Sequence, residues 1–94
     1  MLYLILLVYL RPLSEVDKHM DAHREFLKKH YDAGHFLISG RKEPRSGGVI
    51  LARAESSDDV VRWVSEDPFK QAGVASYELI RWTPTMAAEG WPFD

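Results

Sequence analysis

Two residues of the chain have side chains suited to acid/base chemistry near neutral pH. His23 lies on the apolar face of a predicted helix in MDAHREFLKKHYDAGHFLISG, and Asp67 opens the Asp-Pro-Phe turn of SEDPFKQAG. Imidazole titrates near neutral pH, and a carboxylate that accepts from one ring nitrogen leaves the other nitrogen basic. The pair is therefore a candidate for proton transfer on a bound small molecule. The alternative is that the two side chains only tie a helix to a loop, as buried polar pairs often do.

Ser39 and Arg41, at the end of a predicted strand, are candidates for ligand contacts. Ser39 could offer its hydroxyl, although no G-x-S-x-G elbow surrounds it to make it a nucleophile. Arg41 could hold a substrate carboxylate through a bidentate contact, or it could be a solvated charge of the following turn. No phosphate loop, dinucleotide fingerprint or flavin motif is present in the sequence, so no cofactor is predicted.

A metal site is the other chemistry that the histidines suggest. His19 and His23 have the i, i+4 spacing of zinc-binding helices, but Met20 stands where the zinc motif has Glu. His30 lies about 10 Å further along the helix axis, too far to share one ion with His23. We therefore predict no metal site.

The hydrophobic pattern predicts six elements that must position these residues. The first strand is apolar on both faces, and the helix after it carries an apolar stripe at spacings of three and four from a cap at Ser14 to Gly34. Ser56 or Ser57 caps the second helix, which Pro68 should end near Asp67. The expected strands are residues 2–9, 35–40, 48–54 and 76–83, and the expected helices are residues 14–33 and 57–67.

This β-α-β-β-α-β order predicts an α+β fold of the ferredoxin-like type. Right-handed crossovers place the strands in a four-stranded antiparallel sheet with both helices on one face. The helices then leave the second apolar face of the first strand uncovered. A copy of the same sheet would cover it, so we expect a homodimer.

Length and composition limit the remaining function classes. The 94 residues make one domain, residues 1–94, with a tail at 83–94, and the net charge of −2 without a dense basic run argues against nucleic-acid binding. The absence of cysteine excludes disulfides and thiolate chemistry and suits a cytoplasmic location. The apolar N-terminal run of about nine residues is too short to span a membrane, so no membrane association is expected.

Three segments in their order resemble the YciI-like family: AHREFLKKHYDAGHFLISG, GGVILARAES and SEDPFKQAGV. The resemblance implies a ferredoxin-like fold and a dimer of the α+β-barrel type. It implies a pocket centred on His23 and Asp67, with Ser39 and Gly40 at its strand end. Arg41 stands where many relatives have proline, so the pocket rim differs from theirs.

Together these features predict a small cytoplasmic enzyme that binds a small-molecule ligand. His23 and Asp67 would carry out isomerisation or elimination on an aromatic or enolisable molecule without a cofactor, and Ser39, Gly40 and Arg41 would bind the substrate. The alternative is a non-catalytic dimeric domain that binds a metabolite or another protein. The two differ in whether His23 lines an open cavity or is sealed in the core.

Overall fold

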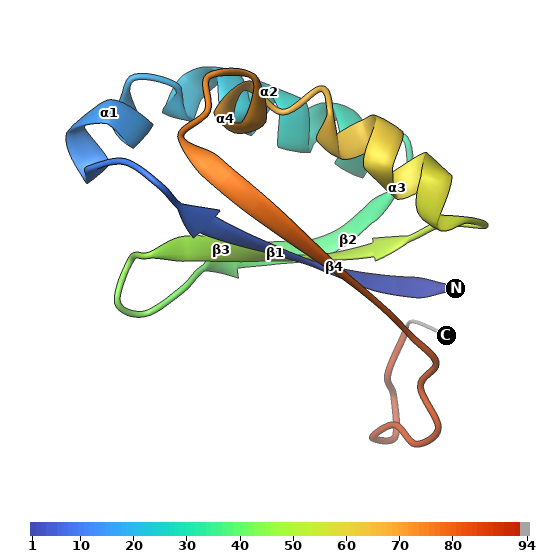
Figure 1. Cartoon of the computed structure of the whole chain (residues 1–94). Coiled ribbons are helices and arrows are strands. Elements are labelled where there is room, and N and C mark those ends of the chain that lie inside the picture. Colours follow the sequence, from blue (N-terminus) through green and yellow to red (C-terminus); the bar gives the residue numbers. More distant parts are fainter. Residues whose placement is uncertain (93–94) are drawn as a thin grey trace.

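The chain folds into one antiparallel sheet with helices on one side of it (Figure 1). The computed structural model describes residues 1–92. Its strands are β1 (Leu2–Tyr9), β2 (Phe36–Arg41), β3 (Gly47–Arg53) and β4 (Ala75–Trp82), and its helices are α1 (Leu13–Asp17), α2 (Met20–Asp32), α3 (Ser57–Val64) and α4 (Pro68–Gln71). The strand order is β2-β3-β1-β4, and every pairing is antiparallel. The predicted ferredoxin-like α+β fold is confirmed.

The first predicted helix is two helices in the structure. α1 begins at Leu13 behind Pro12, so the predicted cap at Ser14 is wrong: Ser14 lies inside the helix. The chain breaks at His19, whose φ of −110° and ψ of 7° are not helical, and α2 then runs to Asp32. Gly34 follows with a φ of +79°, as expected of a residue just past a helix end.

The buried face of α2 differs from the predicted stripe. The sequence pattern favoured Val16, Met20, His23, Leu27 and Tyr31 as one stripe. Val16 is buried in α1, whereas the buried residues of α2 are His23, Phe26 and His30. The Phe26 ring packs edge-on against Phe36 of β2, with 5.7 Å between centroids. Tyr31 stays partly exposed at 36%.

The second predicted helix ends before the Asp-Pro-Phe turn, and a short helix that the sequence did not predict follows it. Ser56 caps α3 by accepting a hydrogen bond from the backbone N–H of Asp59 at 3.4 Å. α3 ends at Val64, and Pro68 then starts the short helix α4 as its first residue, a position where its missing N–H costs nothing. Pro68 therefore begins a helix here as well as ending one.

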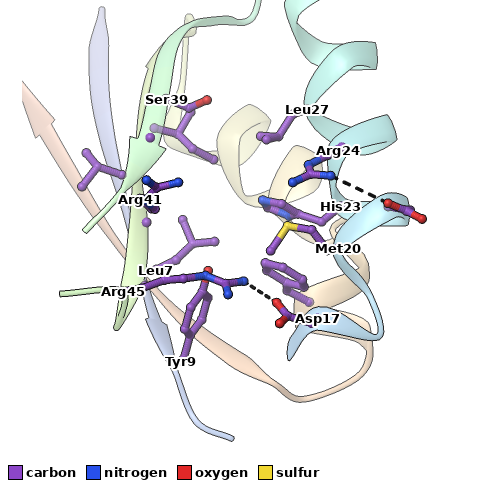
Figure 2. Close-up of a pocket in the computed structure, with 17 residues that line it drawn as sticks. Leu7, Tyr9, Asp17, Met20, His23, Arg24, Leu27, Ser39, Arg41 and Arg45 are labelled. Carbon is purple, nitrogen blue, oxygen red and sulfur yellow. Dashed lines mark hydrogen bonds and ion pairs between the residues drawn. The ribbon is translucent and has the colours of Figure 1, made fainter. Parts of the chain in front are cut away.

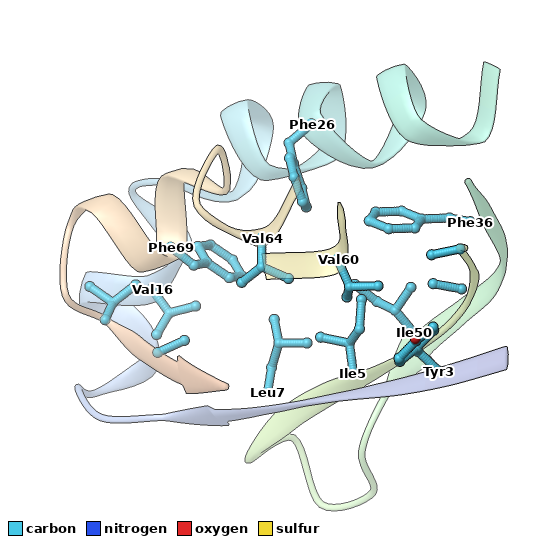
Figure 3. Close-up of a cluster of buried hydrophobic side chains, with 14 residues drawn as sticks. Tyr3, Ile5, Leu7, Val16, Phe26, Phe36, Ile50, Val60, Val64 and Phe69 are labelled. Carbon is cyan, nitrogen blue, oxygen red and sulfur yellow. The ribbon is translucent and has the colours of Figure 1, made fainter. Parts of the chain in front are cut away.

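The core lies between β1 and the helices (Figure 3). Tyr3, Ile5 and Leu7 point toward the helices and are at most 2% exposed. Full burial of an aliphatic side chain stabilises a fold by about 1.5–3 kcal/mol, so this strand face contributes strongly to stability. The opposite face of β1 carries Leu4, Leu6 and Val8, and none of the helices within residues 1–92 covers it.

The described part of the tail, residues 83–92, contains no helix or strand and lies on the side of the sheet away from the helices (Figure 1). Residues 93 and 94 of the predicted tail lie outside the described residues. Within residues 1–92, no helix is both long and apolar enough to cross a membrane.

Gly47 and Gly40 give a matched test of the strand packing. A Cβ on Gly47 would lie 1.8 Å from the backbone oxygen of Leu7, whereas a Cβ on Gly40 would meet nothing within 4 Å. We expect Gly47→Ala to lower the free energy of unfolding by about 3 kcal/mol or more, because backbone must move to relieve the clash. Gly40→Ala should change it by less than about 1 kcal/mol. Urea denaturation of both variants measures the difference; equal stabilities would contradict the described β1–β3 pairing.

Candidate functional site

Asp67 is the buried centre of the site, and its local sequence fixes where its carboxylate lies. Proline disfavours helical geometry in the residue before it, and Asp67 is accordingly extended, with φ −67° and ψ 122°. As the N-cap of α4, its Oδ1 accepts a hydrogen bond from the backbone N–H of Phe69 at 2.9 Å. The residue is fully buried. The Asp-Pro-Phe turn therefore holds a carboxylate inside the protein.

His23 reaches this carboxylate from α2. Its Nδ1 lies 2.9 Å from Asp67 Oδ1. The imidazole also stacks on the Phe69 ring, with centroids 4.0 Å apart and the planes within 5°. The first and third residues of the turn thus fix the imidazole by a hydrogen bond and by a ring contact. With Nδ1–H donating to the carboxylate, Nε2 keeps its lone pair.

Tyr77 completes the surroundings of Asp67, and sequence reasoning missed it. Its hydroxyl donates to Asp67 Oδ2 at 2.5 Å from β4. Burial, and then the nearby Asp67 charge, raise the pKa of Tyr77 far above its usual value, so the phenol keeps its proton. The position of Tyr77 in the last predicted strand could have pointed to this role, because a tyrosine hydroxyl that is buried there needs a hydrogen-bond partner.

A cavity of about 590 Å³ opens beside His23, between α1 and α2 on one side and the sheet on the other (Figure 2). His23 and Phe69 line this cavity, whereas Asp67 lies behind them and does not. No residue among 1–92 makes a hydrogen bond to His23 Nε2. The nitrogen that is free to exchange a proton therefore belongs to a ring on the cavity wall. The remaining lining residues are Leu7, Tyr9, Asp17, Met20, Asp21, Arg24, Leu27, Ser39, Gly40, Arg41, Arg45, Gly47, Gly48, Val49 and Ile50.

The three residues expected to bind substrate all line this cavity. Ser39 and Arg41 project from β2, with Gly40 between them. The Ser39 hydroxyl lies 2.5 Å from the Tyr31 hydroxyl, so it already has one partner. Arg41 Nε donates to Glu43 at 3.2 Å, and both side chains are mostly exposed.

Arg45 and Asp17 form a second polar contact at the cavity. Arg45, from the turn between β2 and β3, pairs closely with Asp17 at the end of α1 (Figure 2). The hydrogen bond to Arg45 holds the pKa of Asp17 below its usual value. The pair links the turn to the helix across the cavity, which the sequence did not predict because 28 residues separate the partners.

The other histidines form a separate cluster at the far end of α2. Buried His30 lies 2.9 Å from His35, Nδ1 to Nδ1, and its Nε2 lies 2.9 Å from Glu66 Oε1. His35 stacks on Trp63 with centroids 3.8 Å apart. Burial, and then the charge of His30, lower the pKa of His35. Among residues 1–92 no group of three or more His, Cys, Asp or Glu side chains could hold a metal ion.

Comparison with known proteins gives a matching family and matching solved structures. The family model described as YCII-related domain matches residues 1–83. One of the matching solved structures is 5-chloro-2-hydroxyhydroquinone dehydrochlorinase from Burkholderia phenoliruptrix AC1100, in complex with 2,5-dihydroxybenzoquinone. It is 26% identical, covers 88% of this chain and 94% of its own, and superposes with a TM-score of 0.76. No match is found among curated proteins.

The family match takes in all four strands and all four helices, and with them the carboxylate, the imidazole and the cavity they face. The solved structure has the same fold over nearly its whole length. The chain therefore belongs to the YCII-related domain family.

Proposed function

We propose that the chain is an enzyme in which His23 transfers protons to and from a small aromatic or enolisable molecule. The proposal rests on the surroundings of the His23 imidazole, which differ on its two sides. His23 Nδ1 contacts a fully buried carboxylate, while the ring itself lines an open cavity. A purely structural tie between helix and loop would need the carboxylate but not the cavity.

The proposed reaction is elimination or isomerisation. His23 Nε2 takes a proton from a carbon or hydroxyl of the substrate, and the electron pair released forms a new double bond. In elimination the leaving group departs with its bonding electrons; in isomerisation the imidazolium returns the proton to another atom. Asp67 stabilises the imidazolium that forms in between. These steps need no cofactor.

The cavity wall supports a ring-shaped substrate. Leu7, Met20, Leu27 and Phe69 give it apolar surfaces, and its volume of about 590 Å³ falls in the range of small-molecule sites. The similar dehydrochlorinase was solved with 2,5-dihydroxybenzoquinone bound. We therefore propose hydroxylated benzenes or quinones as the substrate class of this chain.

A panel of such molecules tests the catalytic proposal. Chloride release from 5-chloro-2-hydroxyhydroquinone reports elimination, and loss of ring protons to deuterated water reports proton transfer on 2,5-dihydroxybenzoquinone. We expect His23→Ala to lower the rate constant of whichever reaction the wild-type chain catalyses by about 10²–10⁴-fold.

His19 provides the matched control, because it lies one turn earlier on the chain and does not line the cavity. His19→Gln should keep the wild-type rate. If the wild type binds 2,5-dihydroxybenzoquinone but accelerates no reaction of the panel beyond His23→Ala, the enzyme proposal is wrong. The chain would then be the non-catalytic metabolite-binding domain that the sequence analysis gave as the alternative.

Tyr77→Phe tests the support of the carboxylate. Losing this hydroxyl leaves Asp67 Oδ2 buried without the donor seen at 2.5 Å, so we expect the free energy of unfolding to fall by about 1–3 kcal/mol. Tyr3→Phe is the control, because the buried Tyr3 hydroxyl has only long contacts, 3.5 Å to Ser57 and 3.9 Å to Met1. Chemical denaturation compares the two; an equal loss in both variants would contradict a special role for Tyr77.

We also propose that the chain acts as a homodimer joined at the uncovered sheet face. Register places Leu4 between Leu51 and Ile80, with Ile38 beyond Leu51 on β2, so apolar side chains cross the whole sheet on this face. Ile38 is 58% exposed and Ile80 is 38% exposed. Burying these side chains against a second copy would remove apolar surface from water.

Sedimentation at micromolar concentration tests the dimer. We expect about twice the 10.8 kDa chain mass for the wild type and the single chain mass for the double variant Ile38→Lys, Ile80→Lys. Val61→Lys, at an exposed apolar position of α3 on the other side of the molecule, should leave the dimer intact. A wild-type monomer throughout this range would overturn the proposal.

A further inference from the structure

The cavity beside His23 has more positive than negative side chains. Three arginines line it (Arg24, Arg41 and Arg45) against two aspartates (Asp17 and Asp21), and among the lining residues His23 is the remaining titratable base. A cavity that served only an uncharged ring would not need three guanidinium groups. The question is which of them a ligand can use.

Arg45 is already paired with another side chain of the protein. It pairs closely with Asp17, its side chain is only 30% exposed, and its guanidinium lies 6.0 Å from the centre of the Tyr9 ring. The hydrogen bond to Asp17 raises the pKa of Arg45 further above its usual value. An incoming anion would have to displace Asp17 and break the link between α1 and the turn.

Arg24 and Arg41 are held far more loosely. Arg24 lies 3.8 Å from Asp21, whose side chain is fully solvated, and Arg41 contacts Glu43 through Nε alone. The side chains of Arg24 and Arg41 are 70% and 71% exposed, respectively. Exposed pairs of this kind contribute little to stability, so a ligand anion can replace them at little cost.

The two loose arginines stand on facing walls of the cavity. Arg24 follows His23 directly on α2, and Arg41 projects from β2 opposite (Figure 2). An anionic group bound between them would place the rest of the ligand along the wall that carries His23. Guanidinium groups suit carboxylates because they donate two parallel hydrogen bonds in one plane.

We infer that the substrate carries a carboxylate, which Arg24 and Arg41 hold from opposite walls while its ring faces His23. The inference rests on the proposed function only for the position of the reacting ring. It adds a specificity element, since an uncharged ring of the same size would leave both guanidinium groups without their ligand.

A pair of probes that differ only in the carboxylate tests this. We expect 2,5-dihydroxybenzoate to bind the full-length protein at least about tenfold more tightly than hydroquinone at low ionic strength, measured by calorimetry. The double variant Arg24→Gln, Arg41→Gln should lose this preference. The double variant Lys28→Gln, Arg62→Gln removes the same net charge from exposed positions outside the cavity and should keep it.

The outcomes separate this inference from the proposed function. Equal binding of the two probes to the wild type would overturn the carboxylate site. So would a preference for 2,5-dihydroxybenzoate that survives in the Arg24, Arg41 variant, or one that disappears in the Lys28, Arg62 variant. His23→Ala should keep the preference, because the imidazole is not part of the carboxylate site. If the preference follows the two arginines but no reaction depends on His23, the carboxylate site stands and the enzyme proposal fails. If uncharged substrates react with full dependence on His23 and the two probes bind equally, the enzyme proposal stands and the carboxylate site fails.

Discussion

The hydrogen bonds to the buried carboxylate of Asp67 are the constraint on which the rest of the structure depends. Three donors reach it from three elements: His23 of α2, the backbone N–H of Phe69 in α4, and the Tyr77 hydroxyl of β4. A buried charge without such partners costs several kcal/mol, so the fold must bring all three together. α2, α4 and β4 are thereby fixed relative to one another at the inner end of the cavity.

The cavity beside His23 also depends on how α1, α2 and the β2–β3 turn are placed. The break at His19 separates α1 from α2, and the Arg45–Asp17 pair then holds the β2–β3 turn near the end of α1. Gly47 and Gly48 line the cavity at the start of β3. The space beside His23 therefore lies between a helix break, a polar link and the sheet, while the core under α3 is filled by aromatic and aliphatic side chains.

Much of this fold could be predicted from alternation and spacing, because the sheet and the helices each bury one apolar face. The strand bounds agree within a residue, and the ferredoxin-like order follows from them. The break at His19 could not be predicted, because no glycine or proline marks it in the sequence. The Asp-Pro-Phe turn pointed to Asp67 through local geometry. The Tyr77–Asp67 and Arg45–Asp17 contacts join residues 10 and 28 positions apart on different elements, and one sequence does not reveal such pairings.

The shared carboxylate also constrains how this sequence can change over generations. A substitution at His23 removes a donor from Asp67 and so weakens the fold at the same moment that it alters the cavity wall. Replacing Asp67 as well would relieve the unpaired charge but would take the cap from α4 and the partner from Tyr77. Descendants can therefore change the exposed arginines of the cavity, and with them the choice of ligand, without weakening the fold, whereas the imidazole, the carboxylate and the phenol are inherited or lost together.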